Sequence, residues 1–398
     1  MSPAFARVQA SLMACCLLLV RTETGAAQSR ILRLQSKILG EERIVHVALP
    51  PNYAQARQRY QVTYLLDGHV RAFFDLTVAA AGYDLAGDVR DYAIPPQIVV
   101  GVEQKDRSAD LGRNQELFSR FLREELIPRI DRDYRTHPYR TLIGHSLGGR
   151  FALNELCRAH GMFRAIVAMS PGGGDSTNMA SLTACLQRSI DESGEVAQQV
   201  VLIAGAREPQ ALVKTRRIHE FLTGAAPGWR VSLLDGADVG HAETPFVGIP
   251  LGLRQVHHAI VWEMPPAMVD SLLNGRADPG AVIASWYARL SAHVGYAVPP
   301  AAKWLRAATA KYLSRHQLDS AEGSARRTVE AFPEDLAGYA LLADVHLAGD
   351  NRDAARRVLE EALRVIDRLE FFDESERILK RASLRTSLEK LQALVSMS

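Results

Sequence analysis

Short apolar runs separated by amphipathic segments fill the first two thirds of the chain. Residues 31–34 and 43–49 alternate apolar and polar positions, and the turn at 39–41 between them predicts an antiparallel hairpin. Longer apolar runs predict buried strands at 61–66, 97–101, 141–143, 165–169, 200–204 and 230–234. Helices are predicted between these runs, most clearly at 73–85 and 118–130. Strands alternating with helices predict an α/β fold, a mostly parallel sheet with helices on both faces.

The pattern changes after about residue 265, where β-rich runs give way to Ala, Leu and Arg. Ser320-Ala321 and Asp353-Ala354 occupy matching places 33 residues apart, and an arginine pair follows each. This period is close to the roughly 34 residues of a tetratricopeptide helix pair. A generic helical bundle is the alternative. Because so few repeats are visible, we expect this part to pack on the first domain.

The first 27 residues are typical of a secretory signal peptide. Arg7 supplies a positive start, residues 12–20 form a short apolar run, and Gly25-Ala26-Ala27 offers small residues for cleavage. A buried N-terminal helix or a membrane anchor is the alternative. We therefore expect a periplasmic or secreted protein with no membrane span after cleavage. The expected divisions are 1–27 signal peptide, 28–265 α/β domain, 266–300 helical connector and 301–398 tetratricopeptide-like repeats.

Composition narrows the class of protein. The 398 residues are 47% hydrophobic and 23% charged, values typical of a soluble globular protein. A formal net charge of +2 without a basic cluster excludes nucleic acid as an expected partner. Only Cys157 and Cys185 would remain after signal cleavage, and the sequence leaves their pairing open. No Cys/His spacing typical of a metal site is present, so no metal or organic cofactor is implied.

The segment Gly144-His145-Ser146-Leu147-Gly148 has the G-x-S-x-G pattern of a nucleophile elbow. A predicted strand precedes it and helical spacing follows it, which is the context that the motif requires. We expect Ser146 in a strained turn, with glycines on both sides because a Cβ there would collide with neighbouring backbone. The five-residue pattern is weak by itself, and an ordinary glycine-rich turn is the alternative.

A serine nucleophile needs a base and an acid, which follow it in the chain order serine, acid, histidine. Glu208 comes after the predicted strand 200–204, and His241 comes in the glycine-flanked loop after 230–234. These two residues are the expected acid and base. Asp175, Asp235 and Asp238 remain alternative acids.

An oxyanion hole needs two backbone N–H donors. The residue after the nucleophile, Leu147, is expected to supply one. The loop after strand 61–66 is expected to supply the other from His69, with Gly68 in reserve. Arg150 and Arg107 are further positions that could meet an anionic substrate, although arginines near a helix start are more often surface residues.

With these residues identified, the chain resembles the putative-esterase family of α/β-hydrolases, the group around esterase D and enterochelin esterase. The resemblance covers roughly residues 30–265. It rests on residues 36–43, 47–50, 64–68, 95–102, 106–107, 110–111, 121–128, 134–135 and 144–149, and on His241 followed by Pro245 and Gly252-Leu253. Some members also carry a tail with tetratricopeptide repeats. Gly172-Gly173-Gly174-Asp175 departs from the bulky aromatics that the family commonly has there. The resemblance therefore does not assign the substrates of the relatives to this chain.

Three functions follow as hypotheses. The first is a serine esterase that cleaves a small-molecule carboxylic ester through an acyl-enzyme on Ser146. The second is an acyltransferase that passes the same acyl group to another alcohol. The third is a scaffold whose helical repeats bind a protein partner, motivated by the tail from Pro300 onward, which an esterase does not need.

Overall fold

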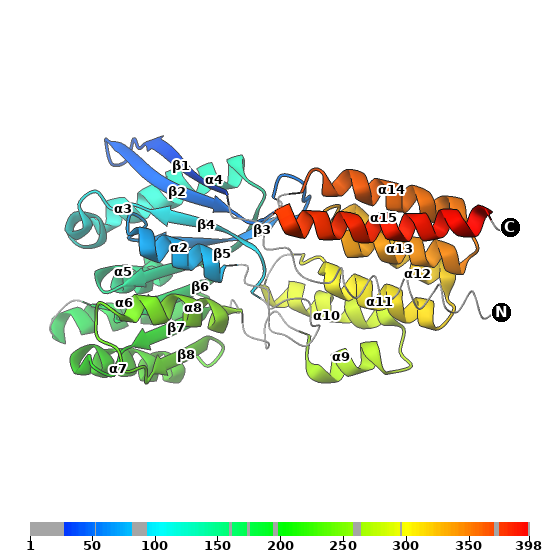
Figure 1. Ribbon diagram of the computed structural model, residues 1–398. Coiled ribbons are helices and arrows are strands. Elements are labelled where there is room, and N and C mark those ends of the chain that lie inside the picture. The colour runs from blue at the N-terminus through cyan, green and yellow to red at the C-terminus, as the bar shows by residue number, and fades with distance from the viewer. Residues whose placement is uncertain are drawn as a thin grey trace.

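An eight-stranded mixed sheet forms the N-terminal part of the protein (Figure 1). The computed structural model describes residues 28–51, 53–81, 94–158, 161–172, 176–193, 198–257, 264–294, 297–369 and 374–396. The strand order is β1-β2-β4-β3-β5-β6-β7-β8, with β2 antiparallel to its two neighbours and the other pairs parallel. The strands are β1 (Gln28–Gln35), β2 (Glu42–Leu49), β3 (Tyr60–Leu66), β4 (Gln97–Val102), β5 (Thr136–His145), β6 (Ala165–Met169), β7 (Gln199–Ala204) and β8 (Arg230–Asp235).

Helices cover both faces of this sheet, because alternate side chains of each buried strand enter different cores. In β3, Val62 and Tyr64 pack with helices on one face, whereas Leu65 packs on the other. The first face carries η1 (Ala109–Arg113), α3 (Gln115–Phe121), η2 (Leu122–Leu126), α4 (Ile127–Asp133), α5 (Leu147–Arg158), α6 (Ser176–Ser193) and α7 (Pro209–Ala225). The second carries α2 (Arg71–Ala80) and α8 (Thr244–Val256). The predicted fold class is confirmed.

Three predicted elements differ in their bounds from the structure. The single helix expected at 118–130 is a longer segment, from Gln115 to Asp133, in which the π-helical segment η2 interrupts the α-helix. The helix expected at 73–85 begins earlier, at Arg71, and ends at Ala80; its last predicted residues lie outside the described part of the chain. The strand before the elbow also begins earlier, at Thr136, because its first residues pair with β3 through a register shift.

The C-terminal part is helical, as predicted. Its helices are α9 (Pro266–Leu273), α10 (Pro279–Val294), α11 (Ala302–Ser314), α12 (Leu318–Ala331), α13 (Leu336–Ala348), α14 (Arg352–Ile366) and α15 (Glu374–Ser396). The first residues of α11 and α13 are 34 positions apart, as are those of α12 and α14. In this alignment Ala321 matches Ala355, both fully buried, and not Ala354. The sequence period of 33 was therefore short by one residue. Whether the helix pairs are tetratricopeptide repeats remains a prediction.

The helical part joins the sheet at the edge where the parallel strands begin. The Gln55 side chain, just before β3, donates a hydrogen bond to the Arg368 carbonyl oxygen at 2.6 Å. Tyr139, near the start of β5, belongs to the same apolar cluster as Trp286 and Trp304 of the helical part. Figure 1 shows the helices extending from this side of the sheet, so they lie away from the edge where the strands end.

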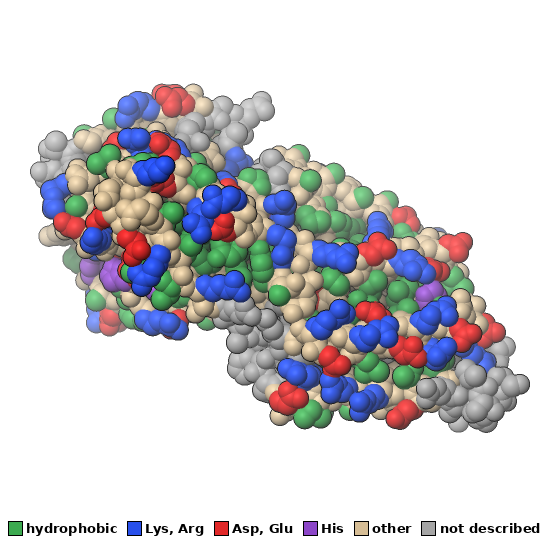
Figure 2. Space-filling model, turned by 90° about the horizontal axis from the view of Figure 1, so that it is seen from above, with side chains coloured by type: hydrophobic (Ala, Val, Ile, Leu, Met, Phe, Trp, Pro, Cys, Tyr) green, Lys and Arg blue, Asp and Glu red, His purple; other side chains and the backbone are tan. Residues whose placement is uncertain are grey.

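Surface charge is mixed, in keeping with the net charge. Figure 2 shows acidic and basic side chains interspersed over both parts of the molecule on the face it presents. Among the described residues, no helix combines the length and the apolar character that a bilayer span requires. The predicted signal peptide, residues 1–27, lies outside the described residues.

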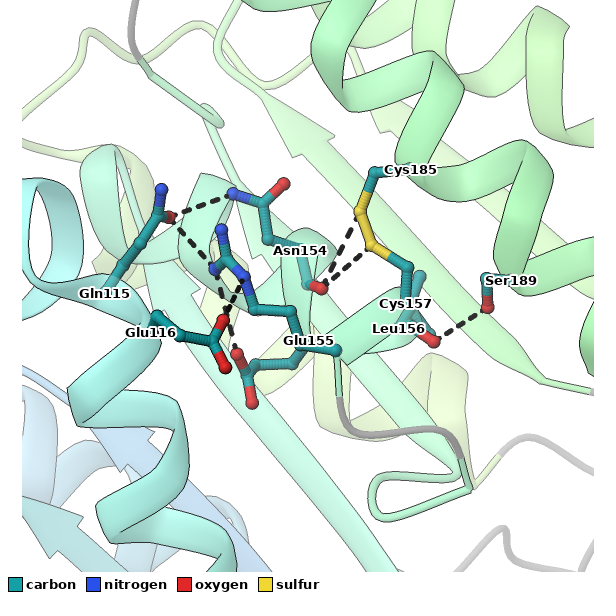
Figure 3. Close-up of a disulfide and its surroundings, with 9 residues drawn as sticks. Gln115, Glu116, Asn154, Glu155, Leu156, Cys157, Cys185 and Ser189 are labelled. Carbon is teal, nitrogen blue, oxygen red and sulfur yellow. Dashed lines mark hydrogen bonds and ion pairs between the residues drawn. A yellow bond between two sulfur atoms is a disulfide. The ribbon is translucent and has the colours of Figure 1, made fainter.

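Cys157 and Cys185 form a disulfide between the end of α5 and α6, with Cα atoms 5.7 Å apart (Figure 3). The pairing that the sequence left open is therefore present in the structure.

Glu155, two residues earlier on α5, is buried with only 1% of its surface exposed. Its Oε2 accepts a hydrogen bond from the Ser119 hydroxyl at 2.9 Å. Burial raises the pKa of this carboxyl to about 7, and the bond from Ser119 and the charge of Arg158 only partly oppose that effect. The folded protein therefore holds a proton here at pH values where the unfolded chain does not.

We expect Glu155→Gln to remove part of the pH dependence of stability. A carboxyl whose folded pKa is raised costs stability as the pH rises from its unfolded pKa, 4.5, through its folded value, about 7. Relative to wild type, the variant should gain on the order of 3 kcal/mol of unfolding free energy between pH 4 and pH 8. Denaturant titrations at both pH values measure this gain. Glu124→Gln, which alters an exposed carboxylate, is the control; an equal gain there would contradict the assignment.

Candidate active site

Ser146 occupies the sharp turn between β5 and α5. Its φ is +57°, in the left-handed region, and its N–H donates to the Met169 carbonyl oxygen at 2.9 Å. A Cβ on Gly144 would lie 2.2 Å from the Gly148 carbonyl oxygen, so the strand can meet the helix this closely only with glycine there. The strained turn expected at the serine is therefore present.

The second motif glycine has a different role from the one expected. A Cβ on Gly148 would make ordinary contacts, at 3.5 Å, with Leu66 and Asp67. Gly149 is more restricted, because its Cβ would come within 2.9 Å of the Met169 carbonyl oxygen. The expected collision thus occurs at Gly144 and at Gly149, where helix α5 crosses the end of β6.

Glu208 and His241 meet beside this turn. Glu208 Oε2 lies 2.5 Å from His241 Nδ1. The His241 ring also lies against the ring of His145, the residue before Ser146, with centroids 4.5 Å apart. The structure therefore gathers the expected acid, the expected base and the elbow at the edge where the parallel strands end.

Two side chains that the sequence did not single out, Ser170 and Thr244, hold the Glu208 carboxylate. Glu208 Oε1 accepts hydrogen bonds from the Ser170 hydroxyl at 2.7 Å and the Thr244 hydroxyl at 2.6 Å. Burial raises the pKa of Glu208, but the bonds from Thr244, Ser170 and His241 outweigh it, so the pKa lies below its ordinary value. The carboxylate is thus charged at neutral pH. Ser170 follows a predicted strand, as Ser146 does, and that position was the available signal.

Backbone hydrogen bonds hold the loop after β7, which carries Glu208, against the loop after β8, which carries His241. The Ala206 N–H donates to the Ala237 carbonyl oxygen at 2.9 Å, and the Arg207 N–H donates to that of Val239 at 3.2 Å. A Cβ on Gly205 would lie 2.1 Å from the Val239 carbonyl oxygen. This close approach explains why a glycine precedes Glu208 after β7.

The alternative acids are engaged elsewhere or are not described. Asp235 accepts from the Arg216 guanidinium at 2.7 Å. Asp238 is almost fully exposed and lies 3.3 Å from Arg207. Asp175 lies outside the described residues.

His145 provides an uncharged neighbour for His241. Burial, and then the nearby His241, lower the pKa of His145 to about 4. His145 is therefore neutral at pH 7 and does not compete for a proton with the imidazole beside it.

The loop after β3 contains the two backbone amides that were expected as oxyanion donors, those of His69 and Gly68. Gly68 N–H donates to the Val102 carbonyl oxygen at 2.9 Å, so the reserve choice for the oxyanion hole is already engaged. Asp67 N–H donates to Gln104 Oε1, and Val70 N–H donates to the Asp67 carbonyl oxygen. The His69 N–H has no acceptor within the described part of the chain, and neither has the Leu147 N–H at the start of α5. Both expected donors are thus available.

An ion pair joins this loop to the elbow. Arg107 Nε and Nη2 donate to the two carboxylate oxygens of Asp67, at 2.6 and 3.0 Å, and Nη2 also donates to the His145 carbonyl oxygen at 3.0 Å. Asp67 itself has a positive φ of 57°. Arg107 thus connects the loop after β3 to the elbow; its expected contact with an anionic substrate stays a prediction.

Gly172 lies close to the Ser146 side chain. Its N–H donates to the Ser146 carbonyl oxygen at 2.8 Å. A Cβ at this position would stand 3.0 Å from Ser146 Oγ and 3.4 Å from Leu147 N. The space above the serine hydroxyl therefore depends on the missing side chain. The following three residues lie outside the described part of the chain.

Arg150 lies one helical turn beyond Ser146 and lines a cavity with α3 and α6.

Within the described residues, no three His, Cys, Asp or Glu side chains form a group that could hold a metal ion.

Comparison with known proteins places part of the chain beside one family. Residues 36–220 match the model of the family described as "Putative esterase". The chain is 32% identical over 158 residues to the uncharacterized protein YjcH of Bacillus subtilis, covering 37% of this chain and 63% of YjcH. It is 46% identical over 55 residues to the ferri-bacillibactin esterase BesA of the same organism, covering 14% of this chain and 19% of BesA.

Among solved structures, the fold is similar to an IroE-like serine hydrolase from Shewanella oneidensis. The TM-score is 0.59 at 21% identity, and the match covers 77% of this chain and 99% of that one. At this identity the likeness concerns the fold. The chain spans less than two thirds of the length of the two curated relatives. The family match covers residues 36–220, a little under half of the chain, and shows that this part is similar to the family described as Putative esterase.

Proposed function

We propose that this protein is a serine hydrolase that cleaves carboxylic esters through an acyl-enzyme on Ser146. The observation that carries the proposal is the hydrogen bond between Glu208 and His241 beside a serine at a φ of +57°. A buried carboxylate that fixes one imidazole nitrogen leaves the other free to accept the serine proton. BesA is named as an esterase of ferri-bacillibactin, so esters of iron chelators are the first natural substrates to test.

In the first half-reaction, Ser146 Oγ attacks the ester carbonyl carbon as its proton passes to His241 Nε2. The amide N–H groups of Leu147 and His69 stabilise the oxyanion that forms. The carbon–oxygen bond to the alcohol then breaks, and the alcohol leaves with the proton from His241. In the second, water attacks the acyl-enzyme, His241 takes its proton, and the acid leaves as Ser146 recovers its hydrogen.

Ser146→Ala should lower kcat for p-nitrophenyl butyrate by a factor of about 10⁴ or more, because the nucleophile is lost. It should also abolish covalent labelling by a fluorophosphonate probe. Ser314→Ala, which alters an exposed serine of the helical part, is the matched control and should keep both. Labelling or turnover that survives in Ser146→Ala would contradict the proposal.

Glu208→Gln should lower kcat at least tenfold and leave KM nearly unchanged. The substitution preserves shape but removes the charge that stabilises the imidazolium, which forms only on the way to the transition state. Asp238→Asn is the control, since that carboxylate lies on the surface beside Arg207. Steady-state kinetics on both variants decide whether Glu208 or Asp238 is the acid. A large loss of kcat in the Asp238→Asn variant alone would mean that Glu208 is the wrong acid.

Gly172→Ala should lower kcat/KM at least tenfold. The new methyl group would stand against Ser146 Oγ and the Leu147 amide, in the space that the attacked carbonyl has to enter. Gly224→Ala, in α7, places a methyl group where nothing lies within 4 Å, and it should behave as wild type. Turnover of p-nitrophenyl acetate and butyrate by both variants measures the effect. Unchanged activity in Gly172→Ala would show that the substrate approaches from another side.

A further inference from the structure

Two phenylalanine side chains contact each other beside the proposed site, and the proposed mechanism uses neither of them. Phe73 belongs to the first turn of α2, and Phe246 belongs to the first turn of α8. Their ring centroids are 5.6 Å apart and their planes meet at 75°, an edge-to-face arrangement. Phe246 remains 52% exposed in spite of this contact. An aromatic surface is therefore open to solvent where these two helices begin.

Both helices begin at the edge of the sheet where the parallel strands end. Helix α2 follows the loop that carries the His69 amide, and the Phe73 N–H donates to the Val70 carbonyl oxygen at 2.9 Å. Helix α8 follows the loop that carries His241, which is five residues before Phe246. The two helices pack against each other on the second face of the sheet (Figure 1). Because helix side chains lean toward the N-terminus, both rings project back toward the strand ends.

His145 connects this aromatic pair to the nucleophile. Side chains alternate along β5, and Ile143 belongs to the core of the second face, so His145 points to that face as well. Its register partner in β6, Met169, belongs to the same core. The His145 ring lies against the His241 ring, and Ser146 is the next residue of the chain. The two imidazoles and the two phenyl rings therefore lie on one side of the nucleophile.

A closed series of contacts holds these groups around the elbow. Arg107 joins the Asp67 carboxylate, in the loop after β3, to the His145 carbonyl oxygen. The contact between Phe73 and Phe246 joins the helix after this loop to the helix after the histidine loop. The rings are thus held in place before a ligand arrives, and a surface on rigid elements loses less conformational entropy on binding.

His241 identifies the part of an ester that faces these rings. In the proposed mechanism its Nε2 returns the proton to the oxygen of the departing alcohol, so the alcohol stands beside this imidazole. His145 is neutral at pH 7 because burial lowers its pKa, so it adds an uncharged ring to this side of the site. The surface beside the departing alcohol is therefore made largely of uncharged aromatic rings.

We propose that Phe73 and Phe246 bind an aromatic ring on the alcohol part of the ester, so that the protein favours esters of aromatic alcohols over those of small aliphatic alcohols. Aromatic rings attract one another in offset-stacked and edge-to-face arrangements, and covering the exposed part of Phe246 removes apolar surface from water. The proposal rests on the proposed function, since it places the alcohol of an ester that Ser146 attacks.

Two acetates that differ only in their alcohol test the proposal. Benzyl acetate and methyl acetate share the acyl group, and their alcohols are nearly equal in acidity, so the step at the carbonyl is comparable. Wild type should have the higher kcat/KM on benzyl acetate. Phe246→Ala should lower the ratio of kcat/KM values, benzyl over methyl, by about tenfold, mainly through a higher KM for benzyl acetate.

The controls separate loss of the ring from loosening of the helix. Leu251→Ala removes another exposed apolar side chain of α8 and should keep the wild-type ratio. Phe246→Tyr keeps a ring and should keep most of the preference. In Phe246→Ala, the kcat/KM ratio of p-nitrophenyl butyrate over acetate, which differ in the acyl group, should not change. An equal change in the alcohol and acyl ratios, or an equal loss in Leu251→Ala, would overturn the proposal.

A binding measurement does not depend on turnover. Saturation-transfer NMR of benzyl alcohol with Ser146→Ala should show binding that disappears when Phe246→Ala is added. Binding that survives this substitution would contradict the aromatic site. Phe246-dependent binding without cleavage of any ester would support the aromatic site while contradicting the proposed hydrolase. Hydrolysis of both acetates with an unchanged ratio in Phe246→Ala would overturn the aromatic site and leave the hydrolase in place.

Discussion

The buried carboxylate of Glu208 is the interaction on which the rest of the site depends. A charge taken out of water is costly unless every oxygen is satisfied, and here hydroxyls and an imidazole satisfy it. Its partners come from the loop after β6 and from the start of α8 and the loop before it. One carboxylate thus fixes the relative positions of three segments, and the sheet below only needs to bring their ends to one edge.

Close packing of backbone against backbone also fixes the positions of the loops around the site. Gly144 contacts Gly148 at the elbow, and Gly68 contacts the last residues of β4. Gly205 contacts Val239, where the loop that carries Glu208 meets the loop that carries His241. At each place a Cβ would come closer than 2.6 Å to backbone atoms, a distance that no adjustment of side chains can relieve. The loops that carry the functional groups are therefore held by contacts that leave no room for another residue.

Much of this arrangement could be predicted from the sequence. Buried strands appear as apolar runs because both faces of a parallel sheet are covered, and the order of strands restricted the candidates for the acid and the base to a few residues. Thr244 and the Asp67–Arg107 ion pair could not be found this way, because hydrogen bonds between loops distant in sequence leave no local pattern. The helical repeat was misaligned by one residue because small, similar residues such as Ala354 and Ala355 follow one another, and only burial distinguishes them.

The apolar cluster behind the site has a consequence for how this chain can evolve. Ile249, Leu253 and Val256 of α8 belong to the same buried cluster as Leu272, Trp286 and Trp304 of the helical part. Helix α8 begins with Thr244, which holds the acid. Losing the helical part would therefore remove part of the apolar cluster to which the helix beside the site belongs. The two parts are not interchangeable modules: recombination that exchanged one of them would have to supply a matching apolar surface at the same time.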